Sequence, residues 1–294
     1  MSPPSTTAVG PGQAPSTPAS RLARSFVGRL GFLTSYSGLI GATMVLVAVL
    51  VAIFASAIAP YDLDEQSLES FAAPSLAHLL GSDQVGRDIF SRLVYAVRLD
   101  LVLAFTAIPI GAGVGIVLGL FGVLSPKLGQ LTARLFDVLL GFPTLVLGLT
   151  LAFIMGAGFG AVLVAIAVLN IPVFGRLARG GMLTQMSRDY IVAVQSLGAT
   201  RWRILWRHIL PNVSDGLFVA AVIAMADAVF IEGGLSILGV GIQPPSASLG
   251  SLLQSGLPYI QLSPLYVLAP TLALAWIILG FALLADAFNE RANL

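Results

Sequence analysis

The sequence contains no cysteine, which excludes disulfides, thiolate metal sites and cysteine nucleophiles. It has only two histidines, His78 and His208, which argues against a histidine-rich metal site. Charge is scarce as well: 10% of the 294 residues are Asp, Glu, Lys or Arg, whereas soluble domains average about 25%. Because 57% of the residues are hydrophobic, the lipid bilayer is the expected solvent. A net charge of +1 gives no reason to expect a nucleic-acid partner.

The sequence also lacks the phosphate-binding pattern G-x-x-x-x-G-K-[ST], and its one lysine, Lys127, lies in LSPKLG. We therefore expect no ATP hydrolysis by this chain, no catalytic residues, and no metal or cofactor bound directly.

The first 34 residues differ from the rest in composition. Residues 1–20 are rich in Pro, Ser, Thr, Ala and Gly and carry no charge, which predicts disorder. Arg21, Arg24 and Arg29 make the remainder basic. The apolar run that follows is longer than the core of a signal peptide, which is about 7–15 residues, so we expect a membrane anchor that is retained. Residues 1–34 are predicted to form a disordered, basic, cytoplasmic segment.

Six apolar segments approach the length of a membrane-spanning helix, about 20 residues. They are predicted near Gly38–Ala59, Leu99–Leu124, two short spans between Val138 and Gly175 that turn at Gly156–Gly160, Asn212–Leu235, and Pro264–Phe288. The fold class is therefore an all-α polytopic membrane protein, with six transmembrane helices in residues 35–294.

Lys and Arg are unequally distributed between the two sides that these spans define. With the N-terminus inside, the outer segments hold only Arg87, Arg92 and Arg98, and the other twelve basic residues lie inside. Because cytoplasmic loops are enriched in Lys and Arg, both termini are predicted to be cytoplasmic.

Two outer segments are long. One, Pro60–Arg98, contains LLGSDQVGRDIFSRLVYAVRLDL. The other, Ile237–Ser263, is uncharged but rich in Gly, Pro, Ser and Gln. Since non-helical backbone at membrane depth must be buried in protein or line water, the second segment is either a surface loop or a re-entrant piece. Its composition favours the surface loop.

The segment Asp189–Asn212, DYIVAVQSLGATRWRILWRHILPN, separates the fourth and fifth spans. Apolar residues at helical spacing predict a first short helix with Ile191, Val194 and Leu197 on one face. Gly198 breaks this helix, and the hydroxyl of Thr200 can cap a second one.

The second helix is predicted to gather its apolar residues on one face, namely Trp202, Leu205, Trp206 and Ile209, with Arg201, Arg203 and Arg207 around the rest. Pro211 is expected to begin the next span. An amphipathic helix lying at the lipid surface is one interpretation. Two short helices joined at an elbow also form a compact knob suited to a groove in another protein.

This segment resembles the cytoplasmic loop in the membrane subunit of bacterial ATP-binding-cassette importers. That loop carries a Glu-Ala-Ala triplet, a glycine four positions after the last alanine, and a Leu-Pro farther on. The corresponding residues here are Val192-Ala193-Val194, Gly198 and Leu210-Pro211, so the acidic member of the triplet is replaced by valine.

Three further stretches resemble the second permease of dipeptide, oligopeptide and nickel importers. The outer LLGSDQVGRDIFSRLVYAVRLDL is similar to the segment after that permease's first span. RLFDVLLGFP, Arg134–Pro143, is similar to the start of its third span, and Ile231–Gly250 to its stretch between the last two spans. The resemblance covers about Ser35–Glu290, with its motifs in the same order. The final ADAFNERANL departs from the family's basic-acidic ending.

The resemblance implies a multi-pass permease of the bacterial cytoplasmic membrane, within an ATP-driven importer of di- or oligopeptides. An importer of nickel or another small solute is the alternative. The implied partners are a homologous second permease, two ATPase subunits or a tandem pair that hold ATP and Mg²⁺, and an extracytoplasmic solute-binding protein. The loop of about residues 188–211 would contact the ATPase, through Val192, Ala193, Val194, Gly198, Ala199, Thr200, Arg201, Leu210 and Pro211.

Carboxylates in or near the spans leave two other functions open: a proton-coupled secondary transporter and an intramembrane enzyme. A charged residue at the centre of a membrane helix costs about 2.5–3.5 kcal/mol. Asp137 and Asp286 lie near span ends, where we expect water or a salt bridge. Asp227 and Glu232 are candidates for a pathway or gate, and they are about 140° apart around one helix.

Two other groups of residues have simpler interpretations. The glycines of GAGVGIVLGLFG, Gly111–Gly122, lie inside a span and predict close helix packing. In the outer segment, Ser82, His78 and Asp83 include the residue types of a hydrolytic triad, but no motif orients them. Asp83, Arg87 and Asp88 are instead candidates for ion pairs within the outer loop or for contact with the binding protein.

Overall fold

The structure is a computed structural model that describes residues 35–292, so the predicted disordered segment 1–34 lies outside the described residues. The long helices are α2 (Tyr36–Ile53), α4 (Ile89–Leu124), α7 (Phe159–Met186), α10 (Leu210–Ile237) and α12 (Pro264–Ala292). The shorter α-helices are α3 (Ala55–Ile58), α5 (Pro126–Gly141), α6 (Thr144–Met155), α8 (Asp189–Ser196), α9 (Arg201–Ile204) and α11 (Leu249–Gly256). Two single turns are a π-helical one at Leu205–Ile209 and a 3₁₀ one at Leu257–Tyr259.

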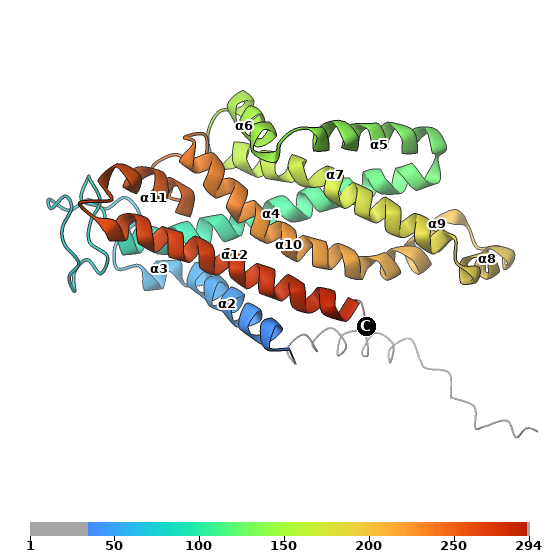
Figure 1. Cartoon of the computed structure of the whole chain (residues 1–294), viewed down its shortest axis with the longest axis horizontal. Coiled ribbons are helices and arrows are strands. Elements are labelled where there is room, and N and C mark those ends of the chain that lie inside the picture. Colours follow the sequence, from blue (N-terminus) through green and yellow to red (C-terminus); the bar gives the residue numbers. More distant parts are fainter. Residues whose placement is uncertain (1–34, 293–294) are drawn as a thin grey trace, which may run out of the picture.

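The long helices form an elongated bundle with two distinct ends (Figure 1). Helices α8 and α9 project at one end, and the non-helical residues 60–88 lie with α11 at the other. The start of α2 and the end of α12 are directed toward the end that carries α8 and α9. This arrangement agrees with an all-α membrane protein.

Five helical segments of the described residues are long and apolar enough to cross a membrane: Tyr36–Ile53, Ile89–Val123, Phe159–Met186, Trp202–Ile237 and Pro264–Glu290. The remaining predicted span is the third in chain order. In the structure it corresponds to α5 followed by α6, and the axes of these two helices are bent by 96° relative to each other. The bend occurs at Phe142-Pro143. Residues that precede proline avoid the helical region, and Phe142 is extended with φ −87° and ψ 139°.

The predicted turn between the third and fourth spans is correct, because α6 ends at Met155 and α7 begins at Phe159. Gly156 and Gly158 occupy positive φ values of 81° and 141°, which other residues rarely adopt. The second span was predicted to start at Leu99, but α4 begins ten residues earlier, at Ile89. The Asp88 side chain caps this earlier start by accepting a hydrogen bond from the backbone N–H of Ser91.

Helices α4 and α7 approach each other closely along glycines. Gly111, Gly115 and Gly119 recur every four residues on α4, so they lie on one face. A Cβ on Gly115 would lie only 3.0 Å from the amide nitrogen of Gly175 on α7. One on Gly119 would lie 2.5 Å from the Gly175 carbonyl oxygen. The predicted packing role of this glycine-rich stretch is therefore confirmed.

The outer segment 237–263 is not the surface loop that its composition favoured. It folds into α11 and neighbouring turns, with Val240, Ile242, Ala247, Leu249 and Leu252 all buried. Ser248 caps α11 through a reciprocal pair with Ser251: each side chain accepts the other's backbone N–H, at 3.0 and 2.8 Å. The capped helix packs against α4, α10 and α12, so the start of α11 and the turn before it are part of the protein interior, while residues 257–262 remain largely exposed.

We predict that Gly115→Leu will strongly destabilise the chain in detergent, because the new side chain has no space against the α7 backbone. Overpacking of this kind costs about 1–3 kcal/mol. Thermal unfolding measures the effect. Gly113→Leu is the matched control, because a Cβ on Gly113 meets no atom within 4 Å. Equal unfolding temperatures for the two variants would contradict the glycine-lined contact.

Candidate coupling segment and outer-end network

The segment between α7 and α10 forms a knob, which we define as residues 188–211. Its first helix, α8, carries Asp189 in its first turn, where a carboxylate favours the positive end of the helix dipole. The helix ends at Ser196, Leu197 is its C-cap, and Gly198 follows with φ +80°. The predicted break at Gly198 is thus present as an elbow with left-handed backbone, a conformation that glycine adopts without a steric penalty.

The second half of the knob begins at Thr200, whose hydroxyl accepts a hydrogen bond from the Arg203 amide at 3.4 Å. The predicted single apolar face is wrong, because its members separate. Leu205 and Ile209 are buried, whereas Trp202 and Trp206 are 53% and 56% exposed. The same holds for the first helix, where Ile191 is buried and Leu197 is 87% exposed. The knob therefore presents apolar side chains outward as well as inward.

The knob is tied to α10 by hydrogen bonds. The Asn212 amide nitrogen donates to the His208 carbonyl oxygen at 2.6 Å and to the Tyr190 hydroxyl at 3.3 Å. The Tyr190 hydroxyl in turn donates to the Gln185 side chain on α7 at 3.0 Å. Residues from α7, α8 and α10 thus meet at one point at the base of the knob.

The knob also continues into α10 without a break. The backbone N–H of Leu210 donates to the Leu205 carbonyl oxygen five residues earlier, which is the hydrogen bond of a π-turn. Pro211 follows directly and has no N–H to contribute to the helix. The sequence placed the start of the fifth span at Pro211, but one helical segment runs from Trp202 to Ile237. Any displacement of the knob would therefore act directly on this span.

The structure places the predicted coupling residues at different depths. Ala193, Thr200 and Pro211 are exposed, while Val194, Ala199 and Leu210 are partly buried. The side chains of Val192 and Arg201 lie outside the part of the chain that the structure describes.

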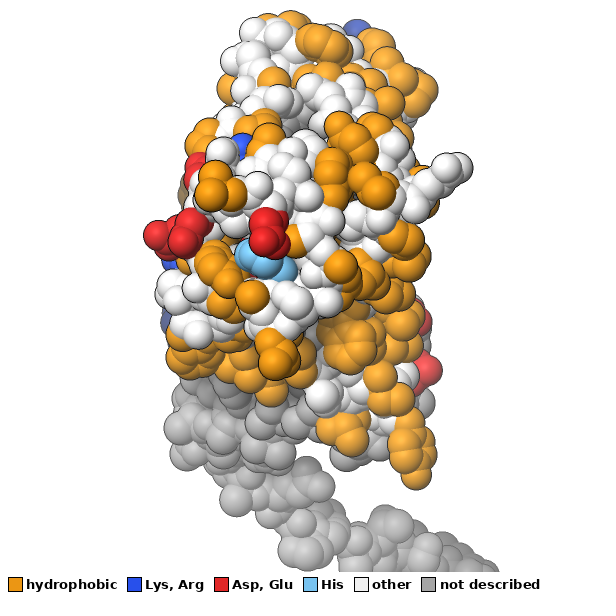
Figure 2. Space-filling view, turned by 90° about the vertical axis from the view of Figure 1, so that its left-hand side faces the viewer, with side chains coloured by type: hydrophobic (Ala, Val, Ile, Leu, Met, Phe, Trp, Pro, Cys, Tyr) orange, Lys and Arg blue, Asp and Glu red, His pale blue; other side chains and the backbone are white. Residues whose placement is uncertain are grey.

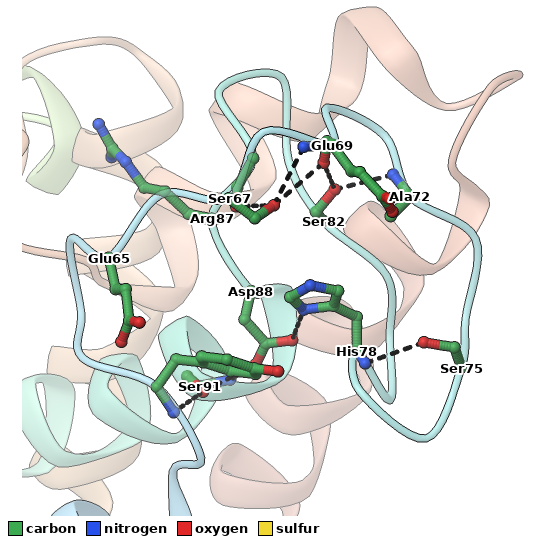
Figure 3. A network of polar contacts seen from close by, with 12 residues as sticks. Glu65, Ser67, Glu69, Ala72, Ser75, His78, Ser82, Arg87, Asp88 and Ser91 are labelled. Atoms are coloured by element: carbon green, nitrogen blue, oxygen red, sulfur yellow. Dashed lines mark hydrogen bonds and ion pairs between the residues drawn. The ribbon is translucent and has the colours of Figure 1, made fainter.

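At the opposite end, residues 60–88 form a compact polar network (Figure 3). The Ser82 hydroxyl donates to the Glu69 carbonyl oxygen at 2.6 Å and accepts from the Ala72 amide at 2.8 Å. The Ser67 hydroxyl donates to the Gly86 carbonyl oxygen at 2.9 Å. Hydrogen bonds of this kind replace regular secondary structure in fixing the backbone.

The three candidate residues of the outer segment all take part in this network. One Asp83 oxygen accepts the backbone N–H of Val85 and of Arg87, each at 2.9 Å. Arg87 lies 3.8 Å from the Asp64 carboxylate. Asp88 accepts the Ser91 N–H at 2.7 Å with one oxygen and lies 3.0 Å from His78 Nδ1 with the other. Because His78 contacts Asp88 and Ser82 bonds to backbone, these residues do not form a hydrolytic triad.

The end of the bundle that carries residues 60–88 displays acidic side chains beside a histidine (Figure 2). The exposed acids of this segment are Asp62, Asp64, Glu65 and Glu69. The knob at the other end carries arginines, so the two ends of the molecule differ in charge.

The two candidate pathway carboxylates lie in unlike surroundings. Asp227 is exposed on α10, ten residues before its end, or about 15 Å along the helix. Glu232 is fully buried. Sequence reasoning missed Asp100, which is also fully buried and lies next to Glu232. It is the second residue of the span predicted at Leu99–Leu124, and no role was predicted for it. Asp137 forms a salt bridge with Arg176, as expected, and Asp286 is exposed.

Two family models match the chain, one over its larger C-terminal part and one near its start. The model described as "Binding-protein-dependent transport system inner membrane component" matches residues 111–293. The second model, "N-terminal TM domain of oligopeptide transport permease C", matches residues 30–76.

Curated relatives match over most of their length. The chain is 33% identical to the di/tripeptide transport system permease protein DppC of Pseudomonas aeruginosa, covering 86% of each chain. It is 34% identical to the glutathione transport system permease protein GsiD of Pectobacterium atrosepticum, covering 89% of this chain and 88% of that protein. Among solved structures, the inward-facing MetNI methionine ABC transporter shares the fold, with a TM-score of 0.56 and 19% identity over 70% of this chain and 97% of that chain.

We predict that Asp88→Ala will lower the free energy of unfolding by about 1–3 kcal/mol, because α4 loses its cap and buried donors lose their acceptor. Chemical or thermal unfolding in detergent gives the value. Asp62→Asn, on an exposed side chain of the same segment, is the control and should change little. An Asp88→Ala variant as stable as the control would show that the network does not hold the outer segment.

Proposed function

The chain belongs to the family of binding-protein-dependent transport system inner membrane components, and from this premise we propose that its knob couples a separate ATPase to the import of di- or oligopeptides. The protein is a multi-pass permease subunit of the bacterial cytoplasmic membrane. The observation that carries the proposal is the knob itself, an elbowed pair of short helices that is continuous with two spans and exposes apolar side chains.

The knob is suited to a protein groove more than to a lipid surface. A helix lying on a membrane turns its apolar residues to one side. Here Leu197, Trp202 and Trp206 are exposed on both halves of the knob, while Ile191 and Leu205 are buried and hold the two halves to the bundle. A concave partner surface can cover side chains that project from two helices.

In the proposed topology the knob is cytoplasmic and both termini lie on the same side. Twelve of the fifteen basic residues fall on that side, which supports this orientation. The bent pair α5–α6 serves as one of six spans, and residues 35–294 form a single permease domain with the knob as its coupling loop.

The proposed partners follow from the family. Two ATPase subunits or a tandem pair hold ATP and Mg²⁺ and receive the knob. A homologous second permease completes the membrane pathway, and an extracytoplasmic binding protein delivers solute to the acidic outer end. Closure of the ATPases moves the knob, which tilts α7 and α10, and hydrolysis resets them. The chain itself contributes no ATPase site.

Peptides are the proposed substrates because relatives at 33–34% identity are named as di/tripeptide and glutathione permeases. Import of nickel or another small solute is the alternative within the family. Asp227 is a proposed pathway residue. Its carboxylate is exposed on a span of the single chain, where lipid contact would be unfavourable, and a pathway shared with the second permease would supply water and cationic peptide N-termini.

We predict that Gly198→Val will weaken both co-purification of the ATPase and transport, while membrane insertion is retained. A β-branched residue at φ +80° strains the elbow, at a cost of about 1–3 kcal/mol. There is open space around Gly198, so the effect is on backbone conformation and not on packing. The measurement is a pull-down from mild detergent with all partners expressed, together with peptide uptake.

Gly180→Val is the matched control, because Gly180 is exposed in α7, has no positive φ, and a Cβ added there would meet no atom within 4 Å. Ala193→Arg tests the surface of α8 without changing the backbone, and it should also uncouple transport. Full coupling in both Gly198→Val and Ala193→Arg would exclude the knob as the ATPase contact. A chain that purifies alone and transports without an ATPase would indicate a secondary carrier.

We also predict that Asp227→Asn will reduce the uptake of peptides with a free N-terminus by more than the uptake of N-acetylated peptides, because only the former carry an ammonium group. Competition assays with matched peptide pairs provide the ratio. Asp286→Asn, on an exposed residue near the end of α12, is the control. An unchanged ratio would remove Asp227 from substrate recognition.

A further inference from the structure

Two carboxyl groups meet in the interior of the outer half of the bundle. Asp100 lies on α4 and Glu232 on α10, and each is 0% exposed. The two groups are close enough for a direct hydrogen bond between them. Among residues 35–292, neither forms an ion pair with Lys, Arg or His. Two buried negative charges without a cation would be strongly unfavourable.

Hydrogen-bond donors reach the pair from the start of α11. One Asp100 oxygen, Oδ2, accepts the backbone N–H of Leu249 at 3.1 Å. Glu232 Oε1 accepts the Ser236 hydroxyl at 2.6 Å. The Ser248 hydroxyl and the Gly250 N–H also lie against the Glu232 carboxyl. The hydrogen bonds from Leu249 and Ser236 thus reach Oδ2 of Asp100 and Oε1 of Glu232.

The second oxygen of each group is left without a donor. Asp100 Oδ1 and Glu232 Oε2 are buried and have no hydrogen-bond partner among the described residues. Carboxylate oxygens are acceptors only, so two of them cannot bond to each other while both groups are ionised. Two like charges in contact also repel far more strongly in the protein interior than in water. One hydrogen between the two oxygens supplies the missing donor and removes this repulsion.

We propose that Asp100 and Glu232 form a proton-binding site that holds one proton between Oδ1 and Oε2, and that the resulting monoanion fastens the start of α11 to α4 and α10. The proton comes from water when the outer segment folds and returns to water when it opens. The remaining negative charge faces the N-terminus of α11, whose dipole and free N–H groups favour an anion.

No cationic side chain on the neighbouring elements neutralises the pair in place of this proton. Residues 237–256, which include the start of α11 beside the pair, contain no ionisable side chain. On α4, Arg98 is exposed, and being two residues from Asp100 it points to the opposite side of the helix. On α10, Asp227 is exposed and acidic. The outer charges Asp83, Arg87 and Arg92 interact with one another and with Tyr266 of α12.

The backbone around the pair allows little rearrangement. A Cβ on Gly250 would lie 2.7 Å from both Gly233 Cα and Ser236 Cβ of α10. The Ile242 N–H donates to the Ser236 hydroxyl at 3.1 Å, which fixes the chain as it leaves α10. The segment from α10 to α11 is therefore held as one unit, and it would move together with the span that carries the knob.

Amide substitution and infrared spectroscopy test the site directly on the full chain in detergent. The wild type should show the C=O stretch of a protonated carboxylic acid at neutral pH, and the band should shift in D₂O. Asp100→Asn and Glu232→Gln should each remove it, because the remaining group is then ionised. Asp286→Asn should leave it unchanged. Absence of the band in the wild type, or its persistence in both single variants, would overturn the proposal.

Stability separates a proton from a bound metal cation. Each single amide places an N–H₂ group between the two oxygens, so both variants should unfold at temperatures close to the wild type. Asp100→Ala leaves the Glu232 oxygen unpaired and should unfold at a distinctly lower temperature. Failure of both amide variants to fold contradicts the shared proton. A wild-type unfolding temperature that falls when Na⁺ and K⁺ are replaced by choline would also contradict the shared proton, because it would indicate a bound metal cation. Neither measurement involves transport, so the outcome is independent of the proposed function.

Discussion

The contact between α4 and α7 is the interaction on which the rest of the bundle depends. Helices in lipid gain little from burying apolar surface against each other, so close van der Waals packing has to hold them together. Glycines at every fourth position of α4 allow its backbone to reach the α7 backbone directly. Helix α4 also contacts α2, α5, α10, α11 and α12, and it carries the capped start at Asp88 and the buried Asp100. Its position therefore sets the geometry of the outer end, while α7 leads to the knob.

The parts of this fold that could be predicted from sequence are those in which one residue type has one physical consequence. Gly198 and Gly156–Gly158 predicted breaks because few residues adopt positive φ, and the structure has breaks at both places. The glycines of α4 predicted packing because they lie within an apolar run. Long uncharged segments predicted spans whose centres were right, although charged residues at their ends hid the true start of α4.

The parts that could not be predicted depend on contacts between distant residues. The composition of segment 237–263 suits a surface loop as well as a buried, capped helix, and only its contacts with α4, α10 and α12 distinguish the two. Asp100 gave no signal, because its partners Glu232 and Leu249 are more than a hundred positions away. Likewise Trp202 and Trp206 have the spacing of a buried face, but Leu205 and Ile209 already occupy the space against the bundle.

The π-turn at Leu205–Ile209 determines how the knob is rotated about the axis of α10. A π-turn holds one more residue than an α-turn, and each residue of an α-helix corresponds to about 100° of rotation. The extra residue therefore sets the direction in which α9, with the exposed Trp202, points around the axis of α10. A related permease with one residue more or fewer at this turn would direct the same side chains about 100° farther around the axis of α10. The five-residue π-turn thus fixes how the exposed side chains of the knob are oriented relative to the faces of α10.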